Sequence, residues 1–390
     1  MNRNVALLAL SQAAVMTTIS LVLSSSALVG VQLSSPGLAT VPLAIQYLAT
    51  MLVLYPVARL MERHGRRSVF GAGALAGALG LAVAAVGIRL GSFILFAGAG
   101  FLIGIFNAVG QYYRFAAADA VPAERKSMAI SLTLSGGLLA AVAGPMLARW
   151  TRDAFEPPFY ASFLALIGVA LLGALFTAGL QLPPMVPSDH QENPRPLAQI
   201  AANPKFMLAV LGGVVGYSIM NLLMTATPLA MMSCHLSFSQ TATVIQWHVV
   251  AMFAPSFFTG SLIQRIGTLP VMLLGCFLNL GSIAISLMGT ELHHFELALI
   301  LLGIGWNFLY VGATSLLTET YRKEEKTRIQ AFNDTLVFLG VTVVTMLSGT
   351  LVNTLGWQTV NMYAAAPIVL VMAVIFRQIK WSHISWLRIN

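Results

Sequence analysis

The stretch that decides the fold is ARLMERHGRR, residues 58–67, which carries four arginines and one glutamate in ten positions. On either side the chain has no Asp, Glu, Lys or Arg, from residue 4 to 58 and again from residue 68 to 88. A membrane-spanning helix needs about 20 apolar residues, so the first run is long enough for two helices and the second for one. Residues 58–67 are therefore predicted to form a short charged loop between two spanning helices.

Uncharged runs of this kind recur along the whole chain. Hydrophobic residues make up 57% of the 390 residues and charged residues 9%, whereas about a quarter of a soluble chain is charged. Divided at their polar interruptions, the runs predict twelve spans, centred near residues 17, 48, 78, 104, 138, 169, 216, 250, 279, 306, 342 and 367. Strands of a membrane barrel would alternate polar and apolar residues, and no segment does so. The sequence therefore predicts an all-α integral membrane protein with twelve transmembrane helices.

The net charge of +8 follows the predicted loops. If the N-terminus is cytoplasmic, most of the 21 Lys and Arg residues fall in cytoplasmic segments, among them Arg63, Arg66 and Lys326. Basic residues are enriched in the cytoplasmic loops of membrane proteins. We therefore expect a multi-pass, monomeric protein of a bacterial cytoplasmic (inner) membrane, with both termini cytoplasmic. Its expected partners are the lipid bilayer and a small-molecule substrate, and no nucleic acid.

A polar, proline-rich segment separates two sets of six predicted spans. Residues 181–204 are too polar to span a membrane and too rich in turn-forming residues to fold alone. Their prolines are Pro183, Pro184, Pro187, Pro194 and Pro196. We interpret residues 1–180 as an N-terminal six-helix bundle, residues 181–204 as a cytoplasmic linker and residues 205–390 as a C-terminal six-helix bundle.

The two halves share residue types at matching positions. At an offset of 200 the matches include Asn107 with Asn307, Asp119 with Glu319 and Glu124 with Glu324, and at an offset of 202 Gly65 matches Gly267. Transporters often pair two similar halves around a site near the middle of the membrane. We therefore expect two bundles related by a pseudo-twofold axis.

Residues 58–67 resemble the loop signature of the major facilitator superfamily, Gly-x-Leu-x-Asp-Arg-x-Gly-Arg-Arg, which joins the second and third helices. Ala58 replaces the first glycine and Glu62 replaces the aspartate. A second feature of the family, an acidic residue followed by Pro-x-Glu-Arg, is similar to Asp119 with residues 122–125. Together with the twelve spans and the central linker, the resemblance covers nearly the whole chain. It implies the fold of this superfamily.

The resemblance also implies a conformational latch at the cytoplasmic face. Arg66 would pair with Asp119, and Glu62 would face the positive N-terminus of the eleventh helix. Gly65 permits the tight turn that this arrangement needs. Such contacts would form when the two halves close on the inside and break when they open. The alternative is that these charges only anchor short loops and set the topology.

Polar side chains within the spans are the candidates for substrate binding, because a polar group in a membrane helix faces the bundle interior or a water-filled cavity. In the superfamily the first, fourth, seventh and tenth helices line that cavity. Helical stripes on three of these helices give the candidate residues Asn107, Gln111, Arg114, Tyr217, Asn221, Thr225, Trp306, Asn307 and Tyr310. The alternative is hydrogen bonding between helices without a ligand, and for Arg114 a structural role at the membrane surface.

His248 lies near the middle of the eighth predicted span. A histidine changes its charge near neutral pH, so this residue is the candidate for proton coupling. The alternative is a histidine that is hydrogen-bonded in the protein core. No Asp or Glu lies in the middle of a predicted span, and Asp119 and Asp334 lie near cytoplasmic helix ends. Facilitated diffusion therefore remains an alternative to proton coupling.

One group outside the spans contains residues that bind metals. Glu291, His293, His294 and Glu296 lie in a predicted outer loop, and imidazole and carboxylate groups are zinc ligands. A solvated loop is the simpler interpretation, so we expect no metal site. The sequence contains no phosphate-binding glycine loop, and we expect no cofactor and no enzymatic activity.

These observations favour a secondary transporter that moves a small neutral or weakly anionic organic solute by alternating access. One alternative is an importer of a heteroaromatic nutrient, because residues 225–260 also resemble carriers associated with vitamin uptake, riboflavin included. Another is an exporter of drugs or metabolites. A third, from a different class, is a membrane sensor or assembly partner that no longer transports.

Overall fold

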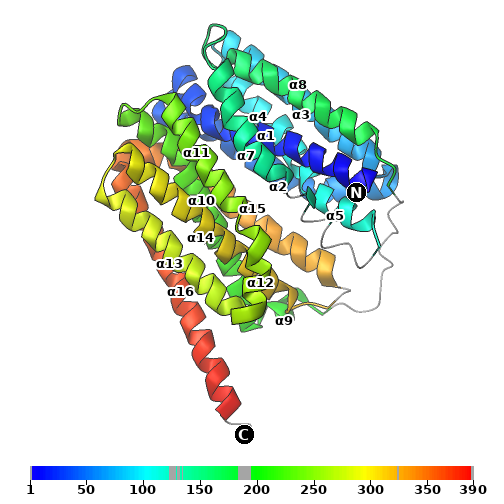
Figure 1. Ribbon diagram of the computed structural model, residues 1–390, viewed down its shortest axis with the longest axis vertical. Coiled ribbons are helices and arrows are strands. Elements are labelled where there is room, and N and C mark those ends of the chain that lie inside the picture. Colours follow the sequence, from blue (N-terminus) through cyan, green and yellow to red (C-terminus); the bar gives the residue numbers. More distant parts are fainter. Residues whose placement is uncertain are drawn as a thin grey trace.

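The structure is a computed structural model that describes residues 2–122, 129, 132–133, 135–182, 195–322 and 325–387, without the side chains of residues 326, 327 and 380–387. All regular elements in these ranges are helices (Figure 1). In chain order they are α1 (Arg3–Leu33), η1 (Pro36–Leu38), α2 (Val41–His64), α3 (Arg66–Arg89), α4 (Phe93–Gly110), α5 (Tyr113–Asp119), α7 (Gly136–Thr151), α8 (Tyr160–Ala178), α9 (Leu197–Ala201), α10 (Pro204–Ser233), α11 (Phe238–Phe253), α12 (Ser256–Ile266), α13 (Thr268–Met288), α14 (Leu292–Thr318), α15 (Lys326–Leu355) and α16 (Trp357–Leu387). The all-helical class is therefore confirmed.

Within the described ranges, ten helical segments are long and apolar enough to cross a membrane, and α11 with α12 makes an eleventh if this bent pair is one span. The fifth expected span, centred near residue 138, corresponds to α7, which has 16 residues. Several residues that precede α7 lie outside the described ranges. The described residues therefore establish a multi-pass membrane protein with ten or eleven candidate spans, one or two fewer than the twelve predicted.

Glycines make the tight turns at the predicted charged loop and at its counterpart. Gly65 separates α2 from α3 with a φ of 78°, and Gly267 separates α12 from α13 with a φ of 90°. Residues with a side chain rarely adopt this left-handed region of φ, whereas glycine does so at little cost. The offset of 202 residues therefore matches two positions with the same backbone conformation.

Most helix packing occurs within residues 2–182, the first half, or within residues 195–387, the second half (Figure 1). In the first half α1 packs against α7 and α8, and α3 packs against α4 and α8. In the second half α10 packs against α14 and α15, and α13 packs against α14 and α16. The halves meet chiefly through α2 with α15 and through α7 with α11.

Four of the ten spans are the most deeply buried. They are α10 at 72% and, at 61% each, α1, α14 and the segment Phe93–Asp119 that contains α4 and α5. These are the first, fourth, seventh and tenth predicted spans, the helices that the resemblance assigned to the centre. By contrast, α16 is only 33% buried. The polar stripes of the central helices therefore lie inside the helix assembly.

The helix assembly has two ends, which differ in how the halves touch. One end, called here the N-terminal face, contains Asn2, which donates to the carbonyl of Ala120, together with the start of α10 and the C-terminal part of α16. At the other end, called the opposite face, Thr350 Oγ1 donates to the Gly37 carbonyl at 2.9 Å. The hydrogen bonds between the halves in the described residues are all on this side, and they also join Gly349 N to Thr40 Oγ1 and Arg149 to Thr243. The halves are therefore closed at the opposite face.

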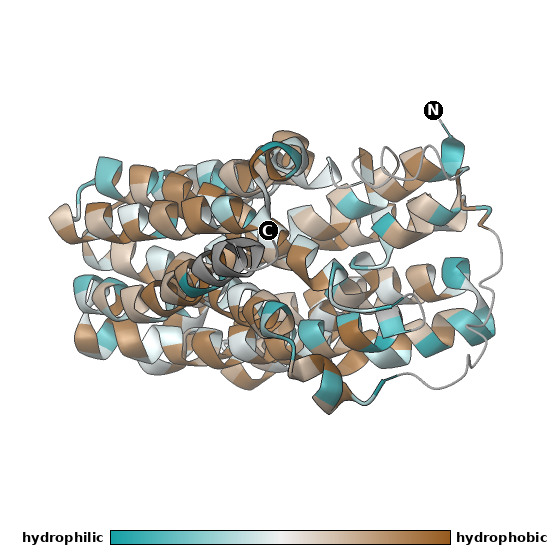
Figure 2. Cartoon of the chain, turned by 90° about the horizontal axis from the view of Figure 1, so that it is seen from below, coloured by the Kyte–Doolittle hydropathy of each residue, from teal (hydrophilic) through white to brown (hydrophobic). Residues whose placement is uncertain are grey.

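The outer surface is apolar, as a bilayer requires. Large hydrophobic side chains such as Leu79, Ile94, Leu175 and Phe257 are more than half exposed. Figure 2 shows hydrophobic residues along the lengths of the helices and hydrophilic residues gathered toward the end that carries the N-terminus. The hydrocarbon core of a membrane takes the place of water around such a surface.

We predict that Gly104 is required for the close packing of α4 against α2. A Cβ at Gly104 would lie 2.4 Å from the Gln46 carbonyl oxygen, whereas a Cβ at Gly98 on the same helix meets nothing within 4 Å. Replacement of Gly104 by Ala should lower the free energy of unfolding by roughly 1–3 kcal/mol, because the two helices must move apart. Replacement of Gly98 by Ala is the matched control. It should leave the free energy of unfolding unchanged or raise it, because Ala favours helix.

Thermal unfolding of the purified protein in detergent measures both effects. Equal unfolding midpoints for the two variants would contradict the packing described for α2 and α4.

Candidate functional site

Three aromatic side chains from two central helices form a compact group. Tyr217 lies on α10, and Trp306 and Tyr310 lie about one turn apart on α14. The Trp306 and Tyr310 rings are stacked, with centroids 5.2 Å apart and an interplanar angle of 11°, and the Tyr217 ring meets them edge-on at 5.4 and 5.2 Å. Tyr217 and Tyr310 are partly exposed, and Trp306 is 7% exposed. These three residues are called the aromatic cluster below.

The aromatic cluster lies where the two halves meet. Phe338 of α15 packs on Tyr217, with ring centroids 6.0 Å apart. Both tyrosines of the cluster also pack against a buried group that includes Phe338 and Tyr47. Because Tyr47 belongs to α2, the first half contributes to the surroundings of the cluster. Aromatic faces and edges of this kind suit a flat, unsaturated ligand.

Arg114 and Gln111 lie at a break in the fourth predicted span. A turn at residues 111–112 separates α4 from α5, and both side chains are partly exposed. The Arg114 guanidinium lies over the ring of Phe115, 4.9 Å from its centroid. Its Nε is buried and has no hydrogen-bond partner among the described residues. The structure therefore leaves hydrogen-bonding capacity on Arg114 beside the aromatic cluster.

Asp334 belongs to this group, and the sequence analysis missed it. The Asp334 carboxylate lies within the span Arg328–Leu355. Its charge interacts electrostatically with Arg114, Tyr217 and Tyr310. It accepts a hydrogen bond from the Asn333 side chain at 3.1 Å and makes no direct ion pair with Arg114. Its position near a helix end concealed its role. The available signal was helical spacing, because Asp334 and Phe338 are one turn apart on α15.

The three candidate asparagines make hydrogen bonds between or along helices instead of facing an open site. Asn107 is 4% exposed, donates to Thr50 Oγ1 of α2 at 3.2 Å and accepts from Gln111 at 3.3 Å. Asn221 is 1% exposed and donates to the hydroxyls of Thr225 and Thr345. Because their polar groups already have partners, Asn107, Asn221 and Thr225 connect helices in this conformation.

Asn307, the third of these asparagines, holds a break in the eighth predicted span. Helices α11 and α12 are bent by 41° at Pro255, because proline lacks an N–H group and interrupts a helix. Asn307 Nδ2 donates to the Met252 carbonyl at 2.8 Å and to Ser256 Oγ at 2.7 Å. Its Oδ1 accepts from Thr259 Oγ1 at 2.7 Å. A carbonyl freed inside a membrane must find such a partner, so Asn307 attaches α14 to the break.

His248 is fully buried between α11 and α14. Its Nδ1 lies 2.7 Å from the Leu299 carbonyl oxygen, so Nδ1 carries the proton and donates to that oxygen. Its Nε2 is buried and has no partner in the described part of the chain. Nε2 is therefore the atom that would take a second proton, and in this conformation it has no contact with water.

The latch residues lie together at the N-terminal face. Arg66 Nη2 is 2.6 Å from Asp119 Oδ2, with side-chain exposures of 9% and 45%, and Gly65 makes the turn directly before Arg66. Glu62 is exposed and makes no ion pair within the described ranges. Both partners of the ion pair belong to the first half, and the pair is present although the halves are joined at the opposite face. The pair therefore stabilises the first half internally and does not by itself connect the halves.

The second half has different ion pairs at this face. Glu319, the counterpart of Asp119, pairs with Lys205 Nζ at 2.9 Å, and both side chains are exposed. Exposed pairs of this kind contribute about 0–1 kcal/mol. The matching residues Glu124 and Glu324 lie outside the described residues. Of the charged contacts that the loop signature implies, the described residues therefore show the Arg66–Asp119 pair alone.

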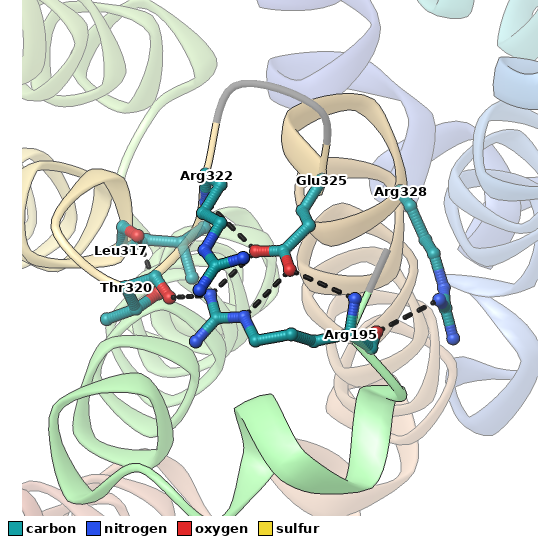
Figure 3. A network of polar contacts seen from close by, with 6 residues as sticks. All are labelled: Arg195, Leu317, Thr320, Arg322, Glu325 and Arg328. Carbon is teal, nitrogen blue, oxygen red and sulfur yellow. Dashed lines mark hydrogen bonds and ion pairs between the residues drawn. The ribbon is translucent and has the colours of Figure 1, made fainter. Parts of the chain in front are cut away.

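A buried carboxylate holds Arg195, a residue of the predicted linker, at the N-terminal end of α15 (Figure 3). Glu325 is 2% exposed and receives a bidentate contact from Arg195, Nε at 2.8 Å and Nη2 at 2.7 Å, and a further hydrogen bond from the Arg322 backbone N–H. The hydrogen bond from Arg195 lowers the pKa of Glu325 from 4.5 to about 2. The pair is therefore complete at neutral pH and is lost only as the pH falls from about 4.5 toward 2.

Three potential metal ligands gather at the opposite face. Glu291, His293 and His294, at the start of α14, place one ligand atom each within 4.8 Å of one another. Glu291 and His293 are exposed and His294 is partly exposed. The loop expected here is wrong, because residues 292–296 form the first turn of α14. Exposed groups of this kind are common without an ion.

Comparison with known proteins matches the chain over nearly its full length. A family model described as the Major Facilitator Superfamily matches residues 5–292 and, separately, residues 209–381. The chain is 39% identical to the riboflavin transporter RfnT of Brucella anthropi over 382 residues, which cover 97% of this chain and 96% of that protein. It is also similar to two uncharacterized MFS-type transporters of Bacillus subtilis. YdeG is 29% identical, over 82% of this chain and 78% of that protein, and YddS is 25% identical, over 89% and 85%.

We predict that Arg66 and Asp119 are energetically coupled. Reversing either charge alone, Arg66→Asp or Asp119→Arg, should lower the free energy of unfolding by roughly 1 kcal/mol, because two like charges then face each other. The double reversal should restore most of the loss, since it rebuilds an opposite-charge pair. Thermal unfolding of the four proteins in detergent gives the coupling. If the double variant loses as much free energy of unfolding as the two single variants combined, the ion pair contributes nothing.

Proposed function

This chain belongs to the Major Facilitator Superfamily, and from that premise we propose that it imports riboflavin, or a closely related heteroaromatic vitamin, by alternating access. The family and the relatives identify it as a membrane transporter and not an enzyme. The observation that carries the substrate proposal is the 39% identity to a riboflavin transporter over 97% of this chain. Such an identity, extending through both halves, makes a shared class of substrate the simplest inference.

The aromatic cluster supports a heteroaromatic substrate. Riboflavin has a flat, three-ring isoalloxazine system and a neutral polyhydroxylated side chain. The parallel pair Trp306 and Tyr310 offers aromatic surface for such a ring system, and Tyr217 offers an edge. Gln111 is partly exposed and its amide can reach a hydroxyl or a carbonyl of a ligand nearby. These features support a neutral or weakly anionic ring compound as the substrate.

We also propose that the complete chain has twelve spans in two six-helix bundles related by a pseudo-twofold axis, with residues 181–204 as the linker. The similar turns at Gly65 and Gly267 support this arrangement. The excess of basic residues supports a cytoplasmic N-terminal face in a bacterial inner membrane. Closure at the opposite face then corresponds to a conformation that is open toward the cytoplasm. At that face Glu62 would contact the second half when the halves close there, while Gly65 and the Arg66–Asp119 pair shape the first half.

Proton coupling through His248 is a separate part of the proposal. The free Nε2 is the atom that would bind the proton, and its burial requires that the proton enter in another conformation. Facilitated diffusion is the alternative, in which His248 serves only to hold α11 against α14 through Leu299.

The test is counterflow of radiolabelled riboflavin in proteoliposomes that contain the purified protein. Vesicles loaded with unlabelled riboflavin should take up the label, and protein-free vesicles should not. Trp306→Ala should reduce the initial rate at least about tenfold, because it removes the stacking surface. Trp247→Ala is the matched control, since Trp247 is half exposed on the outer surface of α11 and should be dispensable. Absence of counterflow by the wild type, with the protein shown to be folded, would refute the riboflavin proposal.

The same vesicles test coupling when a pH gradient is applied. If His248 carries the proton, His248→Ala should abolish accumulation driven by the gradient and leave counterflow measurable. Accumulation that survives this substitution would assign His248 a structural role only. Intact counterflow in the wild type without any effect of the gradient would favour facilitated diffusion. The direction of net accumulation distinguishes import from export.

A further inference from the structure

We propose that Arg114 and Asp334, one from each half, form a subsite that recognises the imide edge of the substrate's ring system, the group C(=O)–NH–C(=O). This inference deepens the proposed function and rests on it. It assigns a role to a carboxylate that the polar stripes did not include. It also narrows the substrate class to planar rings that carry such an edge, among which isoalloxazines are one kind.

A chain of contacts between the halves links the segments that carry the two charged residues. Next to Arg114, the Tyr112 hydroxyl donates to the carbonyl of Leu54 on α2 at 2.7 Å. Leu54 packs against the buried group that includes Phe338, which lies one turn from Asp334 on α15. The α4–α5 break is thereby connected to α15 through α2. Asp334 is within Coulombic range of both Tyr112 and Arg114.

Neither charge uses its hydrogen-bonding capacity fully. Arg114 Nε is buried without an acceptor among the described residues, and the aromatic ring of Phe115 covers one face of the guanidinium. Among the described residues, the Asn333 side chain is the one hydrogen-bond donor to Asp334. Opposite charges within a membrane span normally pair directly, because isolated charges are costly there. These two do not touch in this conformation, which leaves donors and acceptors for a ligand between them.

The aromatic cluster would hold a flat ring next to Arg114 and Asp334. Tyr217 and Tyr310 each lie within Coulombic range of both Arg114 and Asp334. A ring system lying on Trp306 and Tyr310 would therefore present an edge to the two charges. The aromatic cluster would then stack on the ring system, and Arg114 and Asp334 would fix its orientation.

An imide edge matches this pair of charges chemically. Its two carbonyl oxygens accept hydrogen bonds from a guanidinium, and its central N–H donates to a carboxylate. A site that holds such groups rejects analogues that lack the complementary atom, because a buried charge is then left unpaired. Alkylation of the imide nitrogen removes the N–H and retains both carbonyl groups. It therefore tests the role of Asp334 without changing the rest of the ring.

The experiment measures binding to the purified protein in lipid nanodiscs by quenching of flavin fluorescence, with riboflavin and 3-methylriboflavin as the probes. The wild type should bind riboflavin at least about tenfold more tightly than 3-methylriboflavin, as expected for one charge-assisted hydrogen bond. Asp334→Ala should remove this preference by weakening riboflavin alone. Asp334→Asn should keep part of it, because the amide oxygen still accepts the N–H. Arg114→Met should weaken both flavins, since both retain the carbonyl groups.

Asp153→Ala is the matched control, because Asp153 is an exposed carboxylate at the opposite face and its removal should leave the preference unchanged. Thermal unfolding midpoints verify that each variant is folded. If the wild type does not bind riboflavin, the proposed substrate fails and this subsite fails with it. If the wild type binds the two flavins equally, or if folded Asp334→Ala retains the full preference, the subsite alone is overturned.

Discussion

The absence of water inside a bilayer is the constraint on which the rest of this structure depends. A backbone or side-chain polar group in the hydrocarbon region has to find its partner within the protein. Helices satisfy the backbone, and every exception needs a side chain nearby. The break at Pro255 illustrates this, because Asn307 on the neighbouring helix supplies hydrogen bonds to the groups that the break sets free. The same constraint gives Asn107 and Asn221 their interhelical partners.

That constraint separates polar residues that build the structure from those available for function. Amides with hydrogen-bond partners on neighbouring helices connect those helices, whereas Arg114 and Asp334 have unused hydrogen-bonding capacity beside the aromatic cluster. The cluster joins α10 and α14 and touches α2 and α15, so it lies where movement of the halves would change its surroundings. A ligand bound there would favour one arrangement of the halves over another, provided that it binds the two arrangements with different affinity.

The sequence predicted the helical class and the turn at Gly65, because these depend on local composition and on glycine geometry. Residues 58–67 do not form the expected loop, since α2 continues to His64 and α3 begins at Arg66. Helical spacing also placed Tyr217, Trp306 and Tyr310 among the candidate residues, but their grouping into one cluster depends on how α10 packs against α14. Asp334 was missed because the angle at which α15 meets α2 is a property of packing between the halves. The partners of Asn307 were missed for a similar reason, as a proline break gains its meaning only from the neighbouring helix.

The central claim is alternating access, in which the two halves move relative to each other around the aromatic cluster. The most direct test measures two distances between the halves. Spin labels at Leu38 and Leu355 report on the opposite face, and labels at Arg63 and Gln264 report on the N-terminal face, in a variant without the native cysteines. Pulsed electron–electron double resonance measures both distances in nanodiscs, with and without riboflavin. The two distances should change in opposite directions, so that one face opens as the other closes. Distances that both stay constant, or that both increase together, would contradict the account.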